Sequence, residues 1–301
     1  MKTPSVNKKL IVIVGPTASG KSMLAIRLAR KLNGEIISAD SRQVYKGLEI
    51  GSGAVTIRER AKIPHHLIGF VNPKRTFTAA EYKKLARREV ERVWKRGRLP
   101  ILAGGAGLYV RATVDGLIMP EVKPNPKLRK ELGRKGTAEL SRMLKKADRR
   151  RWEEIDKKNP RRLIRALEIA ETLGKVPKMK FDPLKAEILL IGTTPEKKRL
   201  ETAIRERVRK MVRGGLVRET KKLLGSGVSG RRIREFGFEY ADTLDFMEGK
   251  TGSEKELRDT ITRDTLRYAK RKMTWFKNDN RIHWIKSPKE ALDLASKFLY
   301  H

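Results

Sequence analysis

The sequence contains no cysteine and no long apolar run, and it is poor in acidic residues. Without cysteine the chain has no disulfide, no thiolate nucleophile and no metal site built on thiolates. No apolar run approaches the ~20 residues that cross a bilayer. Residues 1–9 also lack the apolar core of a signal peptide. We therefore expect a cytoplasmic protein with no membrane partner.

The shortage of acidic residues makes the chain strongly basic. Its 35 Asp and Glu stand against 71 Lys and Arg, which gives a formal net charge of +36. Such a charge predicts attraction to polyanions, with nucleic acid ahead of an anionic membrane surface. A basic proteome or a high growth temperature is the less specific alternative. That alternative does not explain why the excess is uneven: residues 123–180 by themselves carry 20 Lys and Arg against 8 Asp and Glu.

A glycine-rich loop near the start has the pattern of a phosphate site. Leu10–Val14 predicts a buried parallel strand, residues 15–22 match G-x-x-x-x-G-K-[ST], and Met23–Leu32 has helical spacing. Glycines let the backbone wrap around an anion, and the helix N-terminus supplies positive potential. Lys21 adds a full charge, and the Ser22 hydroxyl can ligate a metal ion. The loop therefore predicts binding of a phosphate or diphosphate, without naming the molecule.

Polar side chains follow the next predicted strand, Glu35–Ala39. Ligand groups of open α/β sheets lie at the carboxyl ends of the strands, so we expect Asp40 beside the phosphate loop. An ordinary turn or cap aspartate is the alternative. A third strand, from Arg98 to Ala103, ends in glycines and predicts another wall of the same site.

Two adjacent histidines, His65 and His66, invite comparison with a metal site. Neighbours on a chain point apart, and no cysteine or nearby third histidine completes a ligand set. A structural or phosphate-neighbouring role is the better expectation.

The expected fold class is α/β: a parallel sheet like that of P-loop NTPases, flanked by helices, with a helical insertion and a helical C-terminal part. We expect residues 1–118 and 187–301 to form the catalytic core and residues 119–186 a basic insertion. The insertion is either a nucleic-acid surface or merely a solvated face. Its predicted helices are Asn125–Leu132, Thr137–Lys146, Asp148–Lys157 and Pro160–Leu173.

The C-terminal part is predicted to be mostly helical. Arg205, Arg207 and Arg209 point in different directions on a helix over residues 195–212, so at most two of them can face one site. Basic and aromatic residues alternate in the second half of a long helix, Glu254–Phe276, which suits RNA binding or a helix whose aromatics are core. The predicted inner stripe of that helix is Leu257, Ile261, Thr265, Tyr268, Lys272 and Phe276.

Taken together, these residues are similar to those of one family, the tRNA dimethylallyltransferases or IPP transferases. The resemblance spans nearly the whole chain, and the sequence after the second strand, Asp-Ser-Arg-Gln-Val-Tyr, is its most specific element. The matching segments are residues 15–22, 39–45, 64–68, 104–109, 162–168, 204–216 and 269–276.

The resemblance implies transfer of a dimethylallyl group from its diphosphate to the N6 amine of the tRNA adenosine immediately 3′ of the anticodon. Mg²⁺ would be the cofactor, with Ser22 as a ligand, and Asp40, Arg207 and Lys21 would be catalytic. Diphosphate would bind Gly15, Pro16, Thr17, Ala18, Ser19, Gly20, Lys21 and Ser22. The anticodon stem-loop would bind Asp40, Ser41, Arg42, Gln43, Ala106, Arg161, Arg162, Leu163, Ile164, Arg165, Arg234, Gly237 and Phe238.

Some features depart from the family pattern. Ala106 replaces a threonine, Lys272 replaces a glutamine, and Ser22 replaces the commoner threonine while keeping the hydroxyl. The rival functions are an isopentenyltransferase acting on free adenine nucleotides, a small-molecule kinase that uses the loop for ATP, and an RNA-binding protein without activity. The intact Lys21, Ser22 and Asp40 argue against the last. We expect a monomer.

Overall fold

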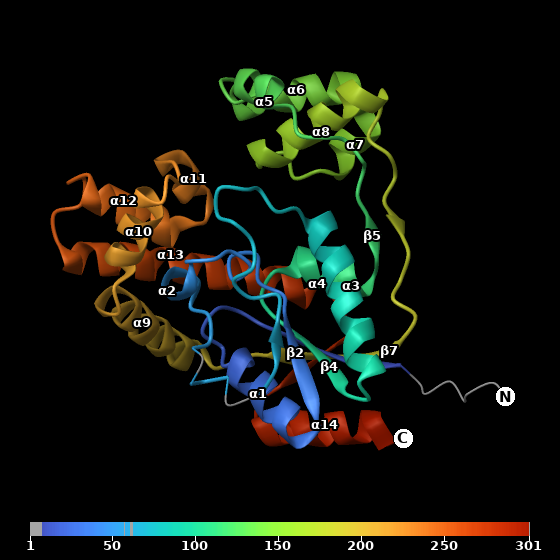
Figure 1. Ribbon diagram of the computed structural model, residues 1–301. Coiled ribbons are helices and arrows are strands. Elements are labelled where there is room, and N and C mark those ends of the chain that lie inside the picture. Colours follow the sequence, from blue (N-terminus) through green and yellow to red (C-terminus); the bar gives the residue numbers. More distant parts are fainter. Residues whose placement is uncertain (1–7, 57, 61–62, 301) are drawn as a thin grey trace. The chain divides into compact units, whose positions relative to one another are not determined.

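The computed structural model describes residues 8–56, 58–60 and 63–300. The chain divides into two compact units (Figure 1). The first comprises the residues up to Gly116 and those from Pro183 onward, and the second comprises Leu117–Asp182. In the described part of the chain, no helix is long and apolar enough to span a membrane.

The first unit is built on a six-stranded sheet in the order β3-β2-β4-β1-β7-β8, and every pair of neighbours is parallel. At its centre, Ile11 pairs with Ile101 on one side and Leu189 on the other. The predicted parallel α/β sheet is confirmed. Its strands are β1 (Lys9–Val14), β2 (Gly34–Ser38), β3 (His65–His66), β4 (Leu99–Ala103), β7 (Glu187–Thr193) and β8 (Ile282–Ile285).

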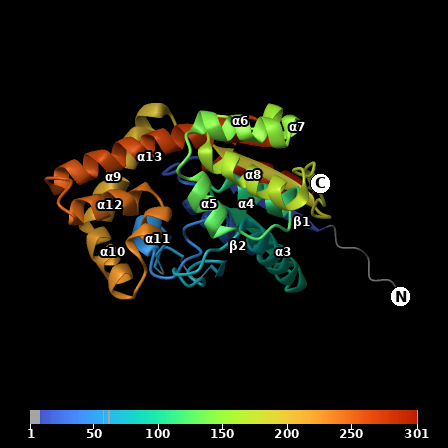
Figure 2. The ribbon, with the colours of Figure 1, turned by 90° about the horizontal axis from the view of Figure 1, so that it is seen from above.

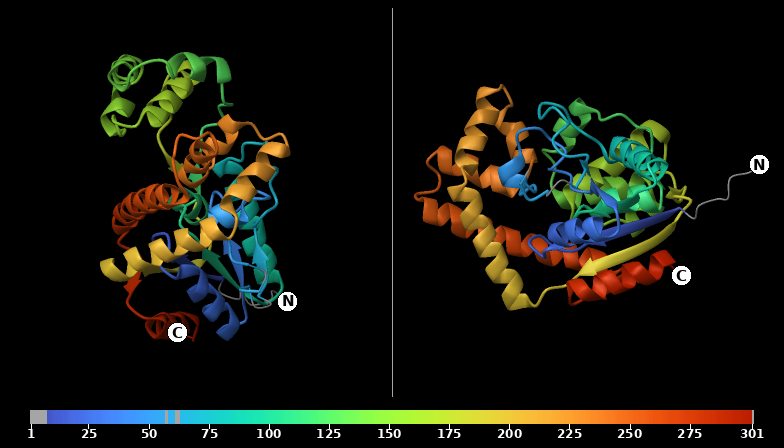
Figure 3. Two further views of the ribbon diagram at one scale, coloured as in Figure 1. Left: turned by 90° about the vertical axis from the view of Figure 1, so that its left-hand side faces the viewer. Right: turned by 60° about the horizontal axis from the view of Figure 1, so that its bottom comes forward.

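Helices cover both faces of this sheet, which explains why its strands read as continuous apolar runs. Leu10, Val12 and Val14 of β1 belong to one core cluster together with residues of α3 and α4. Ile11 and Ile13 alternate with them and pack with α1 and α14 (Figure 3). These helices are α1 (Lys21–Lys31), α3 (Ala79–Lys95), α4 (Gly107–Val114) and α14 (Pro288–Tyr300).

The C-terminal helices form a layer of their own within the first unit (Figure 2). The longest, α13 (Glu254–Lys277), packs against α9 and α12 and buries its predicted stripe, although Tyr268 is only half-buried. The short α11 was not predicted, because Ile233 is its only apolar residue. The remaining helices are α2 (Glu49–Ser52), α9 (Lys197–Arg213), α10 (Leu216–Gly225), α11 (Gly230–Glu235) and α12 (Phe238–Met247).

The second unit is helical, with a short antiparallel ribbon at its two ends. Asn125 and Asn159 each cap a helix that begins with proline, as the sequence suggests. The helix predicted over Asp148–Lys157 is shorter, because Asp148 is its cap and the backbone is extended at Ile155. The elements are β5 (Leu117–Ile118), α5 (Pro126–Leu132), α6 (Thr137–Ala147), α7 (Arg149–Glu154), α8 (Pro160–Leu173) and β6 (Lys180–Phe181).

Candidate active site

The glycine-rich loop joins β1 to α1 at the carboxyl edge of the sheet. Gly15 and Gly20 have φ of 152° and 82°, and Ala18 between them also has a positive φ of 62°. The Ser19 hydroxyl lies 2.6 Å from the hydroxyl of Thr193 at the end of β7, which ties the loop to the neighbouring strand. The loop therefore has the wrapped backbone that a bound anion requires.

Lys21 folds back over this loop. Its Nζ donates a hydrogen bond to the Pro16 carbonyl at 2.9 Å. Burial, together with repulsion from Lys272 and Arg207, lowers the pKa of Lys21 to about 7, although Asp40 opposes the shift. An anion in the loop would offer this amine a charged partner and restore its full positive charge.

Asp40 follows β2 and faces the same cations. Its Oδ1 accepts a hydrogen bond from the Arg42 amide at 2.9 Å, so it also makes the local turn that the alternative interpretation expected. Burial alone would raise the pKa of this carboxyl, but Lys272, Arg42 and Lys21 together hold it below its ordinary value. Asp40 is therefore ionised at neutral pH and able to accept a proton or a hydrogen bond.

Arg207 enters the site from α9 and is fixed against α2. Its Nη2 donates to the Ser52 carbonyl at 2.9 Å. Gly53 leaves the space for this contact, because a Cβ there would lie 2.2 Å from Nη2, at a φ of +58°. Arg205 and Arg209 are exposed instead, and Arg209 pairs with Glu206 at 2.6 Å.

Arg42 is held by a carboxylate that the sequence did not single out, Glu239, and by two aromatic rings. Its guanidinium forms an ion pair with the buried Glu239 of α12. It also lies 5.3 Å from the ring centre of Phe238 and 5.5 Å from that of Tyr268. Glu239 and Tyr268 therefore fix a side chain that was predicted to contact tRNA.

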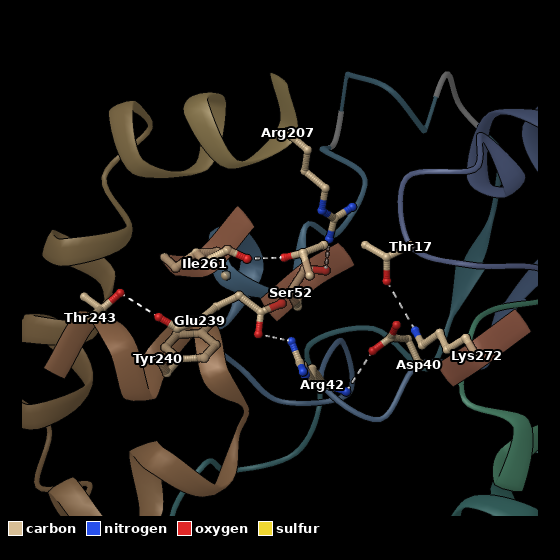
Figure 4. Close-up of polar contacts among 12 residues, drawn as sticks. Thr17, Asp40, Arg42, Ser52, Arg207, Glu239, Tyr240, Thr243, Ile261 and Lys272 are labelled. Atoms are coloured by element: carbon tan, nitrogen blue, oxygen red, sulfur yellow. Dashed lines mark hydrogen bonds and ion pairs between the residues drawn. The ribbon is translucent and has the colours of Figure 1, made fainter. Parts of the chain in front are cut away.

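Lys272 is a cation of the site that sequence analysis placed on the buried stripe of α13 but did not assign to the site. It is only 9% exposed, and its Nζ lies 3.5 Å from the Thr17 hydroxyl of the loop and 4.4 Å from the ring centre of Tyr268. Figure 4 shows its side chain pointing toward Thr17 and Asp40. These groups surround a cavity of about 20 Å³ that is lined by Thr17, Asp40, Ser41, Arg42, Ser52, Ala106, Arg207, Glu239, Tyr268 and Lys272.

A larger cavity, about 810 Å³, adjoins the loop at Ala18, Ser19 and Gly20. It shares no lining residue with the small cavity, which meets the loop at Thr17. Its lining combines apolar side chains such as Met23 with basic ones such as Arg27.

The other predicted tRNA contacts of the first unit differ in whether their side chains face solvent or other protein groups. Ser41 is exposed, whereas the Gln43 side-chain oxygen accepts a hydrogen bond from the Ser38 hydroxyl at 2.9 Å. Arg234 pairs with Asp245 at 2.9 Å and with Glu248 at 3.0 Å. Gly237 lies against the Arg42 guanidinium. Only part of this set is therefore free to meet a ligand directly.

The predicted tRNA-contacting stretch of α8 is also divided. Arg161 and Arg162 are exposed, Ile164 is half-buried and Leu163 is fully buried in the core of the second unit. Arg165 turns inward, where it pairs with Glu168 and donates to the Val122 carbonyl at 2.9 Å. Arg161 and Arg162 are thus the side chains of this stretch that offer charge to solvent.

The two histidines contact protein groups. His66 Nε2 lies 2.6 Å from a carboxylate oxygen of the buried Glu35, which also receives Arg96 at 2.6 Å. His65 Nδ1 lies 2.8 Å from the Ile63 carbonyl oxygen. Among the described residues, no three His, Asp or Glu side chains gather to hold a metal ion. Both histidines help to fix the edge of the sheet.

Comparisons with known proteins agree on one family. The IPP transferase family model matches residues 43–279. The tRNA dimethylallyltransferase of Carboxydothermus hydrogenoformans is 40% identical over 296 residues, covering 95% of this chain and 94% of that protein. That of Acetivibrio thermocellus is 37% identical over 300 residues, covering 96% and 95%. The crystal structure of the tRNA isopentenylpyrophosphate transferase from Bacillus halodurans is 35% identical, with a TM-score of 0.72 over 97% of both chains.

Proposed function

This chain belongs to the IPP transferase family, and from that premise we propose that it transfers a dimethylallyl group from dimethylallyl diphosphate to tRNA. The acceptor is the N6 amine of the adenosine immediately 3′ of the anticodon, and the product is N6-isopentenyladenosine. One observation carries the proposal: an ionised carboxylate, Asp40, lies among cations beside a phosphate loop.

The loop and its cations stabilise the leaving group. As the bond between the allylic carbon and oxygen breaks, the electron pair stays on the diphosphate and positive charge builds on carbon. Lys21 and Arg207, with the loop amides, supply preorganised positive charge where the negative charge develops. The Lys21 ammonium exchanges its neutral partner, the Pro16 carbonyl, for the diphosphate.

Asp40 acts as the base for the acceptor amine. An exocyclic adenine amine is a weak nucleophile, and it must lose a proton once its nitrogen bonds to carbon. The ionised Asp40 accepts that proton, a contribution of about 10²–10⁴-fold for a positioned base. The target base lies in a stacked loop, so it must flip out to bring its amine to Asp40.

The residues of the loop fit Mg²⁺ as the cofactor. Mg²⁺ commonly takes one or two protein ligands and fills its sphere with phosphate oxygens and water. The exposed Ser22 hydroxyl at the start of α1 suits that donor set. Ser22 would hold the ion, which would supply further charge for the leaving pyrophosphate.

The tRNA is proposed to contact both units. In the first unit we assign five residues to the acceptor nucleotide and its neighbours. Four of them line the small cavity: Asp40, Ser41, Arg42 and Ala106. The fifth, Gln43, directly follows Arg42 in the turn after β2. Residues 119–186 are proposed as the basic tRNA-contacting insertion, with Arg161 and Arg162 meeting phosphates. Of the remaining assignments, Gly237 and Phe238 lie against Arg42, whereas Arg234 pairs with Asp245 and Glu248.

The experiment is nucleoside mass spectrometry of tRNA after incubation with the protein, Mg²⁺ and dimethylallyl diphosphate. The expected product is N6-isopentenyladenosine in tRNA whose residue 3′ of the anticodon is adenosine, and none in tRNA with guanosine there. Parallel reactions with AMP and ATP test the free-nucleotide alternative. Prenylated nucleotide without prenylated tRNA would replace the proposal with that activity.

A further inference from the structure

The buried Lys272 is not used by the mechanism above. It comes from α13, far in sequence from the loop and from Asp40, yet its Nζ lies 3.5 Å from the Thr17 hydroxyl. Burying an ammonium costs free energy unless it has partners, and Thr17 is the only hydrogen-bond acceptor that the described residues give it. The site therefore holds a cation with unused hydrogen-bonding capacity, aimed at the phosphate loop.

The neighbours of Lys272 show what it can meet. Asp40 and Glu239 are the acidic groups near it, Arg42 and Arg207 repel it, and the ring of Tyr268 lies 4.4 Å away. Lys21 interacts electrostatically with three of the same groups, because Lys272 and Arg207 repel it and Asp40 attracts it. Counted together, four cations face two anions. This net positive charge is suited to a diphosphate.

We propose that Lys272 is a further catalytic residue, whose ammonium binds the diphosphate at the end of the loop that faces Asp40. This inference rests on the proposed function. Thr17 belongs to the loop that binds the diphosphate, and Asp40 accepts the proton of the acceptor amine. A group between these two residues therefore lies close to the carbon–oxygen bond that breaks. Lys272 meets the oxygen that gains the electron pair, while the amine proton passes to Asp40.

Space around Lys272 supports this assignment. A Cβ on Gly105 would lie 2.5 Å from Nζ, so this glycine, the second residue after β4, leaves room for the ammonium. The same charge also acts on the base, because Lys272 is the strongest of the cations that lower the pKa of Asp40. One side chain thus links the leaving group to the base, and removing its charge should change both.

The test is calorimetric titration of inorganic pyrophosphate into the full-length protein and its Lys272→Gln and Lys272→Met variants. The expected result is at least a tenfold loss of pyrophosphate affinity at neutral pH in both, with tRNA affinity changed less than twofold. Burial lowers the pKa of Lys272, so the wild-type affinity should also fall more steeply with rising pH than that of the variants. Methionine suits a buried helix position if glutamine impairs folding.

Lys270→Gln is the matched control, since it removes the same charge from an exposed position of the same helix. It should change pyrophosphate affinity less than twofold.

The pH profile of kcat gives a second measurement. Its acid limb should shift to higher pH in Lys272→Gln, because Asp40 loses a neighbouring cation and its pKa rises. Folded Lys272 variants that bind pyrophosphate like the wild type would overturn the inference. Prenyl transfer by the wild type is measured separately, and its absence would overturn the proposed function instead.

Discussion

At the scale of single residues, glycines decide how close the cationic side chains come to the backbone. Gly53 accommodates Arg207 and Gly105 accommodates Lys272, and in both cases a Cβ would clash with the cationic group itself. Neither contact is visible in a sequence motif, since Arg207 lies on α9 and Lys272 on α13. The glycines therefore contribute to the site by the space they leave.

Gly53→Ala should displace Arg207 from Ser52. The substitution places a Cβ 2.2 Å from Nη2, and it forces alanine into a left-handed conformation that costs about 1–2 kcal/mol. We expect pyrophosphate affinity to fall at least tenfold, measured by calorimetry. Gly249→Ala is the control, because Gly249 has a similar φ of +73° with nothing within 4 Å of its would-be Cβ. Equal affinity losses in the two variants would contradict the role of Arg207.

Asp40→Asn tests the proposed base. The substitution keeps the shape and the hydrogen bond from Arg42 but loses the charge. We expect kcat to fall about 10²–10⁴-fold with little change in diphosphate affinity. Steady-state turnover gives kcat, and single-turnover reactions at varied concentrations of labelled dimethylallyl diphosphate give the diphosphate affinity. Surviving chemistry with lost diphosphate and Mg²⁺ binding would instead make Asp40 a metal neighbour.

At the scale of elements, Glu168 is the main buried charge of the second unit. It is 1% exposed, and it accepts hydrogen bonds from Arg129 at 2.8 and 2.7 Å and from the Asn125 amide at 2.6 Å. Burial would raise the pKa of Glu168, but these donors and Arg165 hold it at about 2. Glu168 thereby joins α8 to α5 and to the segment that leads into α5.

The depressed pKa of Glu168 makes the second unit sensitive to acid. Its contribution to stability is full above the unfolded value of 4.5 and is lost as pH falls through about 2. Glu168→Gln should destabilise the unit by roughly 3 kcal/mol at neutral pH, because two arginines lose their charged partner. Hydrogen exchange of the α8 amides measures this, with the exposed Glu171→Gln of the same helix as control. Unchanged protection would assign the stability to the apolar core instead.

At the scale of the whole molecule, the sequence predicted the features that follow from the local spacing of apolar residues and glycines. The strands, the loop and the buried stripe of α13 follow from apolar spacing, and they place Lys272 inside the protein. Its contact with Thr17, 255 residues away, and the pairing of Arg42 with Glu239, 197 residues away, depend on how the elements pack. The two-residue β3 and the polar α11 carry too little apolar pattern to be recognised.

The net charge also belongs to the whole molecule, and a deletion tests where it acts. Residues 123–180 carry 20 Lys and Arg against 8 Asp and Glu, a third of the chain's net charge of +36. This span belongs to the second compact unit, whereas the phosphate loop, Asp40 and Arg207 all belong to the first. Replacing residues 123–180 with a short flexible linker should therefore weaken tRNA binding while leaving the diphosphate site intact.

The salt dependence of tRNA binding gives the decisive measurement. Each phosphate that the protein neutralises adds about 0.7–0.9 to the slope of log K against log salt concentration. If Arg161, Arg162 and their neighbours meet phosphates, the deletion variant should show a shallower slope and lower affinity, with pyrophosphate affinity within twofold of wild type. Retained pyrophosphate binding serves as the folding control. An unchanged slope in a variant that passes this control would place the contacts with tRNA phosphates on the first unit. The basic side chains of the insertion would then only face solvent.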